Sequence, residues 1–316
     1  MSAPLIVLGV RRSGTTLLRV MLDRNSRLAV PDESYFVPQL ANRHRGAVDP
    51  REFVEDLRRL PTLREWGVSP DEVGGRLRPG MSSGEAIAAV FEAYAATKGK
   101  ERWGDKTPLY MQHLRTLERL FPDARFVHLI RDGRDAALSF LSMPKGIMTE
   151  GWGHPRDAAG FACQWRTEVV DARALGARVG PRRYLELRYE ELVERPEDAL
   201  RRVCAFADLP YEPQMLGYAG TLDLSAKPHQ QRLEQPPTPG VRDWRADLSA
   251  EDVGAFEAIA GDVLAQLGYE VRSPDTPRRL GSRLRLASYR ARTGAWRLAG
   301  AATQVSPLWR RRHPRL

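Results

Sequence analysis

The distribution of apolar and polar residues along the chain predicts strands that alternate with helices. The run PLIVLGV (residues 4–10) is continuously apolar and ends at glycine, as is typical of a strand buried in a parallel sheet. Further strands are predicted at 27–30, 124–130 and 183–189. Helical spacing predicts helices at 15–25, 50–60, 84–98, 109–120, 132–142, 159–176, 196–207 and 249–267. This alternation predicts an α/β fold, a P-loop-like parallel sheet with helices on both faces.

Two stretches interrupt this alternation. RWGDKTP (102–108) predicts a loop or the end of a strand, and residues 209–245, rich in proline, glutamine and glycine, predict an ordered loop or lid. The pattern Ser82-x-x-Glu85 matches a capping box and predicts the start of helix 84–98. We expect one domain over residues 1–272, followed by a basic tail over 273–316.

The charge of the chain is concentrated in this tail. The 316 residues carry a net charge of +9, yet from Thr276 onward there are eleven arginines and no lysine, aspartate or glutamate. Subtracting those eleven charges leaves about −2 for residues 1–275, so the body does not indicate a general nucleic-acid surface. For the tail, three interpretations stay open: a solvated segment, an amphipathic helix on an anionic membrane surface or acidic partner, and nucleic-acid binding without sequence specificity.

The two cysteines and the N-terminal residues indicate the cellular compartment in which the protein is expected. Cys163 and Cys204 lie in apolar, helix-like surroundings without metal-binding spacing, which predicts buried, reduced thiols. No apolar run approaches the roughly 18 residues of a membrane span. The first residues lack the charged region and cleavage site of a signal peptide. We expect a cytoplasmic protein, with peripheral membrane attachment through the tail as an option.

A candidate phosphate-binding loop follows the first predicted strand. In GVRRSGTTLL (9–18), Gly9, Gly14 and Thr16 match the pattern G-x-x-x-x-G-K-[ST], but Thr15 takes the place of the lysine. The order strand, glycine loop, helix presents backbone amides and a helix N-terminus to an anion. We therefore expect a phosphate cradle without the lysine that nucleotide hydrolases and kinases use.

Arginines add positive charge around this loop. Arg11 and Arg12 lie inside it, where a guanidinium can make bidentate contacts to an oxyanion. Arg131 leaves the strand 124–130 at its carboxyl end, and Ser139 follows two helical turns later on the same helix face. These two residues could bind a second phosphate. The alternative, in which Asp132 and Asp135 serve as caps and dipole partners of an ordinary helix N-terminus, is compatible with this role.

Two further candidates follow predicted strands. Lys106, in RWGDKTP, could supply the positive charge that the phosphate loop lacks; the alternative is a solvated lysine beside Asp105. Glu33 follows the strand at 27–30, where its carboxylate could accept a proton from an incoming hydroxyl.

Together these segments resemble the sulfotransferases that use 3'-phosphoadenosine 5'-phosphosulfate (PAPS) as donor. RSGTTL is similar to the family's 5'-phosphosulfate loop, and IRDGRDAALS to its 3'-phosphate segment. YEELVERP (189–196) is similar to the stretch that follows a late strand. The resemblance covers about residues 4–268, and looks closest to bacterial relatives of the tyrosylprotein sulfotransferases. It implies sulfuryl transfer from PAPS to a hydroxyl or amine, with no metal.

The resemblance also implies which residues bind the donor. The residues of the phosphosulfate loop are Arg12, Ser13, Gly14, Thr15 and Thr16. Those implied for the 3'-phosphate are Arg131 and Ser139, and Tyr189 lines the nucleotide site. A late loop closes over the donor in the family, and its plausible cations here are Lys227, Arg242 and Arg245.

Catalytic roles follow from the same resemblance. Arg12 and Lys106 polarise the leaving oxygen and the sulfuryl group, and Glu33 stands at the position of the general base. Cytosolic aryl sulfotransferases use a histidine base, but Lys106 is followed by Thr107 and Pro108. Tyr35 stands where the tyrosylprotein enzymes carry an arginine that reads acidic peptides, so the class of acceptor is open.

Two other functions make different predictions for this sequence. A P-loop kinase of a nucleoside or small molecule predicts a loop lysine and a magnesium-binding carboxylate, and Thr15 argues against it. A binding module without catalysis, acting at membranes through the tail, gives no reason for Arg12, Glu33, Lys106 and Arg131 to converge.

Overall fold

A five-stranded parallel sheet forms the centre of the molecule. The computed structural model describes residues 3–143, 154–219, 243–272 and 280–305. The strands lie in the order β2-β3-β1-β4-β5, and every paired neighbour is parallel. Their bounds are β1 Leu5–Leu8, β2 Leu28–Ala29, β3 Arg102–Lys106, β4 Arg125–Ile130 and β5 Tyr184–Arg188. The predicted parallel α/β sheet is confirmed.

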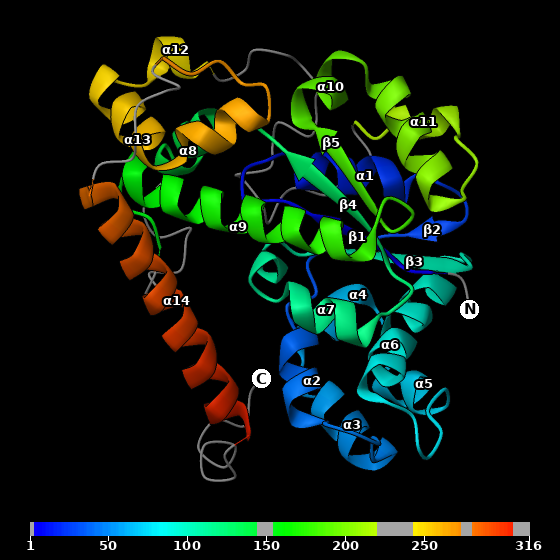
Figure 1. Ribbon diagram of the computed structural model, residues 1–316. Helices are drawn as coiled ribbons and strands as arrows, with labels where there is room; N and C mark the ends of the chain where they lie inside the picture. Colours follow the sequence, from blue (N-terminus) through cyan, green and yellow to red (C-terminus); the bar gives the residue numbers. More distant parts are fainter. Residues whose placement is uncertain (1–2, 144–153, 220–242, 273–279, 306–316) are drawn as a thin grey trace.

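Alternating side chains of the strands bury both faces of this sheet. On β1, Ile6 and Leu8 point into one core, and Leu5 and Val7 point into the other. The first core is closed by α6 (Ser83–Thr97), α7 (Leu114–Leu120), α9 (Ala158–Val179) and α13 (Ala250–Gln266). The second core is closed by α1 (Thr15–Asp23), α10 (Tyr189–Glu194) and α11 (Pro196–Ala207). Figure 1 shows these two helical layers on opposite sides of the strands, which explains why the strand sequences are continuously apolar.

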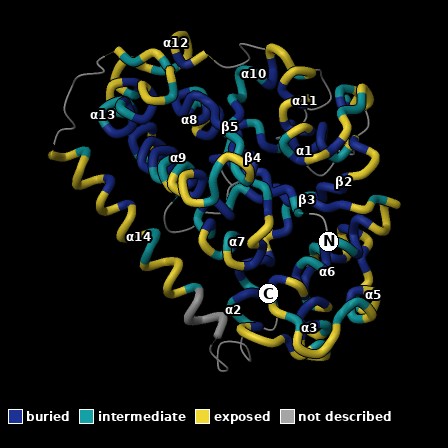
Figure 2. Tube along the Cα trace, turned by 45° about the vertical axis from the view of Figure 1, so that its right-hand side comes forward, coloured by how far each residue is buried: buried dark blue, intermediate teal, exposed yellow. Residues whose placement is uncertain are grey.

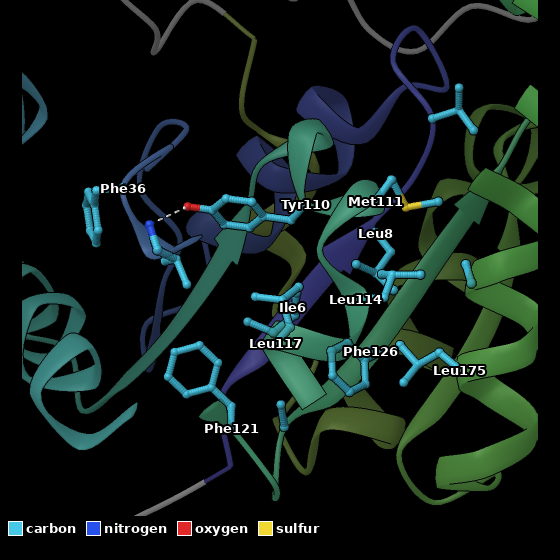
Figure 3. Close-up of a cluster of buried hydrophobic side chains, with 14 of the residues drawn as sticks. Ile6, Leu8, Phe36, Tyr110, Met111, Leu114, Leu117, Phe121, Phe126 and Leu175 are labelled. Atoms are coloured by element: carbon cyan, nitrogen blue, oxygen red, sulfur yellow. Dashed lines mark hydrogen bonds between the residues drawn. The ribbon is translucent and has the colours of Figure 1, made fainter. Parts of the chain in front are cut away.

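The first core also supports the segment that follows β2. Figure 3 shows Ile6 of β1 and Phe126 of β4 packed with Leu114 and Leu117 of α7. At the edge of this cluster, the hydroxyl of Tyr110 accepts a hydrogen bond from the backbone N–H of Val37 at 3.1 Å, drawn as a dashed line. The core therefore fixes the chain just after residues 33–35.

The stretch 102–106 is a central strand, although its polar residues predicted a loop or strand end. All five residues of β3 are buried, between β2 and β1. Asp105 and Lys106 are tolerated there because both make polar contacts at the carboxyl end of the sheet. The predicted helix 109–120 is in two parts, the 3-10 helix η1 (Pro108–Gln112) and α7, since His113 leaves the helical conformation at φ −125°.

Several short helices were not predicted from the sequence. They are α2 (Val37–Arg43), α4 (Pro61–Trp66), α5 (Pro70–Gly74), α10 (Tyr189–Glu194), η2 (Pro213–Leu216) and α12 (Trp244–Asp247). Proline occupies the first position of α4, of α5 and of the predicted α3 (Pro50–Leu57), where its missing N–H costs no hydrogen bond. The capping box of Ser82 and Glu85 is present at the start of α6, as predicted. The predicted helix at 132–142 is α8 (Gly133–Leu141).

The C-terminal segment contains a long helix, α14 (Leu280–Val305), that packs on α2, α9 and α13. Leu286 and Tyr289 of this helix are buried and join the first core. Both cysteines are buried and free, as predicted. In the described ranges, no helix combines the length and the apolar character needed to cross a membrane.

Candidate active site

The carboxyl ends of the five strands bring the predicted site residues to one edge of the sheet. Glu33 follows β2, Lys106 ends β3, the glycine loop follows β1, Arg131 follows β4 and Tyr189 follows β5. Because the strand order is β2-β3-β1-β4-β5, these groups lie in that order along the edge, with the loop in the middle. Ligands of open parallel sheets bind at this edge.

The glycine loop has the backbone of an anion cradle. Gly14, at φ 87°, and Arg12, at φ 70°, both adopt the left-handed region, and Gly14 is the N-cap of α1. The Gly14 position has no room for a side chain, because a Cβ there would lie 2.3 Å from the ring of Tyr189. Such turns leave backbone amides at the start of the helix available to a ligand.

Ser13 provides a polar group that the described protein leaves unused. Its side chain is only 1% exposed, and its hydroxyl has no hydrogen-bond partner within the described residues. Leaving a buried hydroxyl unpaired costs about 1–3 kcal/mol. A phosphate or sulfate oxygen in the loop is a partner that would satisfy it.

A second cluster surrounds the 3'-phosphate candidates. Arg12 Nε donates to Ser139 Oγ at 3.1 Å, and Arg131 Nη1 donates to the carbonyl of Arg12 at 3.2 Å. The Arg131 guanidinium lies 4.5 Å from the centroid of the Tyr189 ring. Trp165 Nε1 donates to the carbonyl of Arg131 at 3.1 Å, a support that the sequence did not indicate. The structure therefore joins the predicted Arg12, Arg131, Ser139 and Tyr189 in one group.

Lys106, Glu33 and Thr16 form a third cluster on the other side of the loop. Lys106 Nζ contacts Glu33 Oε1 at 2.5 Å and donates to Thr16 Oγ1 at 3.3 Å. The ammonium thus reaches the end of the phosphate loop from β3. Lys106 is not the solvated lysine of the alternative interpretation, because its side chain is 2% exposed.

Burial and charge set the protonation of this pair. Burial alone raises the pKa of Glu33, but the charge and hydrogen bond of Lys106 outweigh it, and the Tyr35 hydroxyl also donates to the carboxylate. The pKa of Glu33 is therefore lowered, and the group is an ionised acceptor at neutral pH. Burial also lowers the pKa of Lys106, while Glu33 opposes that change.

A hydrogen-bonded network that the sequence did not predict holds this cluster in place. Ser34 Oγ donates to Asp105 Oδ1 at 3.0 Å and contacts the hydroxyl of Tyr110 at 2.6 Å. Thr107 Oγ1 also donates to Asp105 Oδ1, at 3.2 Å. Burial raises the pKa of Asp105 to about 7. The network thus connects Ser34, the neighbour of Glu33, to Asp105 and Thr107, the neighbours of Lys106. The pair Asp105-Lys106 was the feature of the sequence that pointed to it.

The surroundings of the remaining predicted residues differ from one to the next. Lys227 and Arg242 lie outside the described residues. Arg245 is ion-paired with Glu270 at 2.6 Å. Thr15 is 4% exposed, and its methyl group packs against Gly9, where a Cβ would clash with it. Because the side chain is buried in this way, the backbone of Thr15 is the part that a ligand can contact. Arg12 contacts Ser139, on the 3'-phosphate side of the loop, and its polarising role stays a prediction.

An acceptor can approach Glu33 from the side of Tyr35, which is exposed. Lys106 closes the inner side of Glu33, whereas Tyr35 on its outer side is 48% exposed. Arg11 Nη1 contacts His154 Nδ1 at 3.0 Å, and its guanidinium lies 5.6 Å from the centroid of the Phe140 ring. The arrangement thus offers a cradle and two cations for an anionic donor, beside an ionised carboxylate that can accept a proton.

Comparison with known proteins points to one family. The model described as "Sulfotransferase family" matches residues 4–213. Nodulation protein NoeE of Sinorhizobium fredii is 30% identical over 297 residues, covering 84% of this chain and 66% of that protein. Protein-tyrosine sulfotransferase A of Caenorhabditis elegans is 25% identical over 278 residues, covering 85% and 68%. The chain thus spans about two thirds of the length of these relatives.

Solved structures share the fold. The sulfotransferase domain from the curacin biosynthetic pathway superposes with a TM-score of 0.53 at 20% identity, covering 86% of this chain and 99% of that one. The sulfotransferase domain of the Synechococcus PCC 7002 olefin synthase gives 0.55 at 21% identity, covering 86% and 97%.

Proposed function

This chain belongs to the sulfotransferase family, and on that premise we propose that it transfers a sulfuryl group from PAPS to a hydroxyl or amine of an acceptor. The observation that carries the proposal is the loop at residues 9–14. It combines a left-handed backbone, the unpaired buried hydroxyl of Ser13, and cationic groups from two neighbouring strands, Lys106 and Arg131.

The residues around the loop fit the donor's two anionic ends. The backbone at Gly14, Thr15 and Thr16 would hold the 5'-phosphosulfate together with the Ser13 hydroxyl, which would gain the partner it lacks; the Ser13 N–H already donates to the carbonyl of Val10 at 3.1 Å. Arg131 and Ser139 would hold the 3'-phosphate, with Arg12 between the two ends. Tyr189, which covers Gly14 and stacks with Arg131, would line the nucleotide site. Lys227 and Arg242 stay predicted contacts.

The donor supplies an activated sulfuryl group with a phosphate oxygen as leaving group. Lys106 would stabilise the negative charge that develops on that oxygen, since its ammonium already reaches Thr16 at the end of the loop. Glu33, ionised at neutral pH, would take the proton from the acceptor's hydroxyl or amine. Their contact at 2.5 Å also holds the Glu33 carboxylate at the side of the loop where the sulfuryl group would lie.

The acceptor belongs to an open class. NoeE is named as a nodulation protein, a name that states no acceptor, and other relatives are named protein-tyrosine sulfotransferases. Tyr35, which contacts Glu33, stands where the resemblance places an arginine that reads acidic peptides, and this weakens the case for a protein tyrosine as acceptor. Independence from metal and a cytoplasmic location stay predictions.

The test is calorimetric titration with adenosine 3',5'-bisphosphate in EDTA, compared with ATP and magnesium. We expect tight binding of the bisphosphate without metal and weak binding of ATP. ATP binding that requires magnesium would replace the proposal with the kinase alternative. Inorganic sulfate, titrated into wild type and Ser13→Ala, then tests the loop. The variant should bind sulfate more weakly while its unfolding free energy is unchanged or raised, because the lost hydroxyl had no partner in the described protein.

A further inference from the structure

The helix α14 (Leu280–Val305) has one stripe that fixes it to the body of the protein. Leu286 is 7% exposed and Tyr289 is 5% exposed, and the partly buried Ser282 and Thr293 extend the stripe at spacings of three and four residues. Polar contacts hold the same helix: Arg285 is ion-paired with Asp157 at 2.6 Å. The helix is therefore held at a defined rotation about its axis.

The opposite stripe of α14 is apolar and faces solvent. Its members recur every three or four residues and are all exposed: Leu280, Leu284, Ala287, Ala291, Ala295 and Leu298. The exposed fractions of the three leucines are 71%, 61% and 74%. Among the described residues, six large hydrophobic side chains are classed as exposed, and four of them lie on this helix, Trp296 being the fourth. Figure 2 shows α14 as mostly exposed, with short buried and intermediate stretches between the exposed ones.

Positive charge flanks this apolar stripe. Arg283 and Arg290 lie on one side of it and Arg292 on the other, and all three are exposed. The helix contains no aspartate, glutamate or lysine. An apolar stripe between arginines is complementary to a surface that offers hydrocarbon below a layer of negative charge.

We propose that this face of α14 docks the protein on an anionic lipid membrane surface. The leucines would enter the boundary between headgroups and acyl chains, with the flanking arginines at the phosphate level. A second copy of the chain fits the face less well, because pairing two such helices would bring like charges together on both sides of the seam. The inference does not depend on the transferase proposal, since α14 supplies none of its site residues.

Vesicle co-sedimentation of the full chain tests this proposal. We expect binding to phosphatidylcholine vesicles that contain phosphatidylserine, weaker binding as salt is raised, and little binding to phosphatidylcholine alone. Leu284→Asp should weaken binding about tenfold or more, from the lost apolar burial. Replacing Arg283 and Arg290 by glutamine should weaken it about fivefold per arginine.

Leu141→Asp is the matched control, because Leu141 is 37% exposed on α8 and the change adds the same charge outside the apolar stripe of α14. It should bind vesicles as wild type does. The proposal is overturned if wild type does not bind the anionic vesicles, or if Leu284→Asp binds them equally well. Self-association of wild type that Leu284→Asp abolishes, without vesicle binding, would assign the face to a second copy. Circular dichroism and bisphosphate binding of Leu284→Asp, both expected unchanged, would separate lost docking from misfolding.

Discussion

The loop geometry can be tested with two glycine substitutions that share one strain and differ in one contact. Gly14 and Gly80 have the same φ of +87°, so alanine imposes the same left-handed strain at both positions. That strain costs about 1–2 kcal/mol. The surroundings differ: a Cβ at Gly14 would lie 2.3 Å from Tyr189 Cδ2, whereas at Gly80 no described atom lies within 4 Å.

Gly14→Ala should have a larger effect than Gly80→Ala because the ring of Tyr189 must move to accommodate the new Cβ. Ordinary contact requires about 1 Å more separation than the 2.3 Å available, so Tyr189 has to shift away from the loop. The ring would then leave the Arg131 guanidinium, 4.5 Å from its centroid, a contact worth about 0.5–2 kcal/mol. We expect Gly14→Ala to weaken binding of adenosine 3',5'-bisphosphate about tenfold, and Gly80→Ala to leave it unchanged.

The measurements are urea denaturation for stability and calorimetric titration for bisphosphate affinity. Both variants should lose about 1–2 kcal/mol of unfolding free energy, and Gly14→Ala more than Gly80→Ala. Equal stability losses and equal affinities in the two variants would refute the reasoning, since the contact between Gly14 and Tyr189 would then have no consequence.

Three further predictions concern the charged groups. Glu33→Gln should lower the transfer of labelled sulfate from PAPS to acceptors about 10²–10⁴-fold without weakening bisphosphate binding. Normal turnover would exclude Glu33 as the base. The control is Glu101→Gln, which changes an exposed ion pair with Arg27. Arg131→Ala should weaken bisphosphate binding about tenfold to a hundredfold. Arg125→Ala, at the start of β4, the strand that Arg131 follows, should leave this binding unchanged. Equal affinities of the two variants would exclude Arg131 from the donor site. Asp105 has its pKa raised to about 7 by burial, so folded protein retains a proton that the unfolded chain releases, and stability should fall as pH rises from about 4 to 7. Urea denaturation should show a flatter pH dependence for Asp105→Asn, and an unchanged slope would contradict the buried, protonated state.

Much of the fold was predictable because it depends on local patterns. The strand at 4–10, the glycine loop and the helix after it carry their own signals: continuous apolar residues, two glycines and helical spacing. The resemblance of RSGTTL and IRDGRDAALS then indicated the donor. Proline begins α3, α4 and α5, and a proline at the first helical position is a helix-start signal in the sequence. The helices α4 and α5 are nevertheless too short to show a periodic apolar pattern.

The sequence by itself determined the parallel α/β architecture, the phosphate loop and the residue types that follow each strand, because these depend on neighbours in the chain. The tertiary structure decided what depends on distant segments. Only the strand order brings Lys106 to Thr16 and Glu33, ninety and seventy-three positions away. Only packing reveals β3 as a central strand, since the network of Ser34, Thr107 and Asp105 makes its polar end tolerable in a buried sheet. The rotation of α14, with one stripe buried and the other exposed, likewise follows from its contacts with the body, because large apolar side chains lie on both sides of the helix.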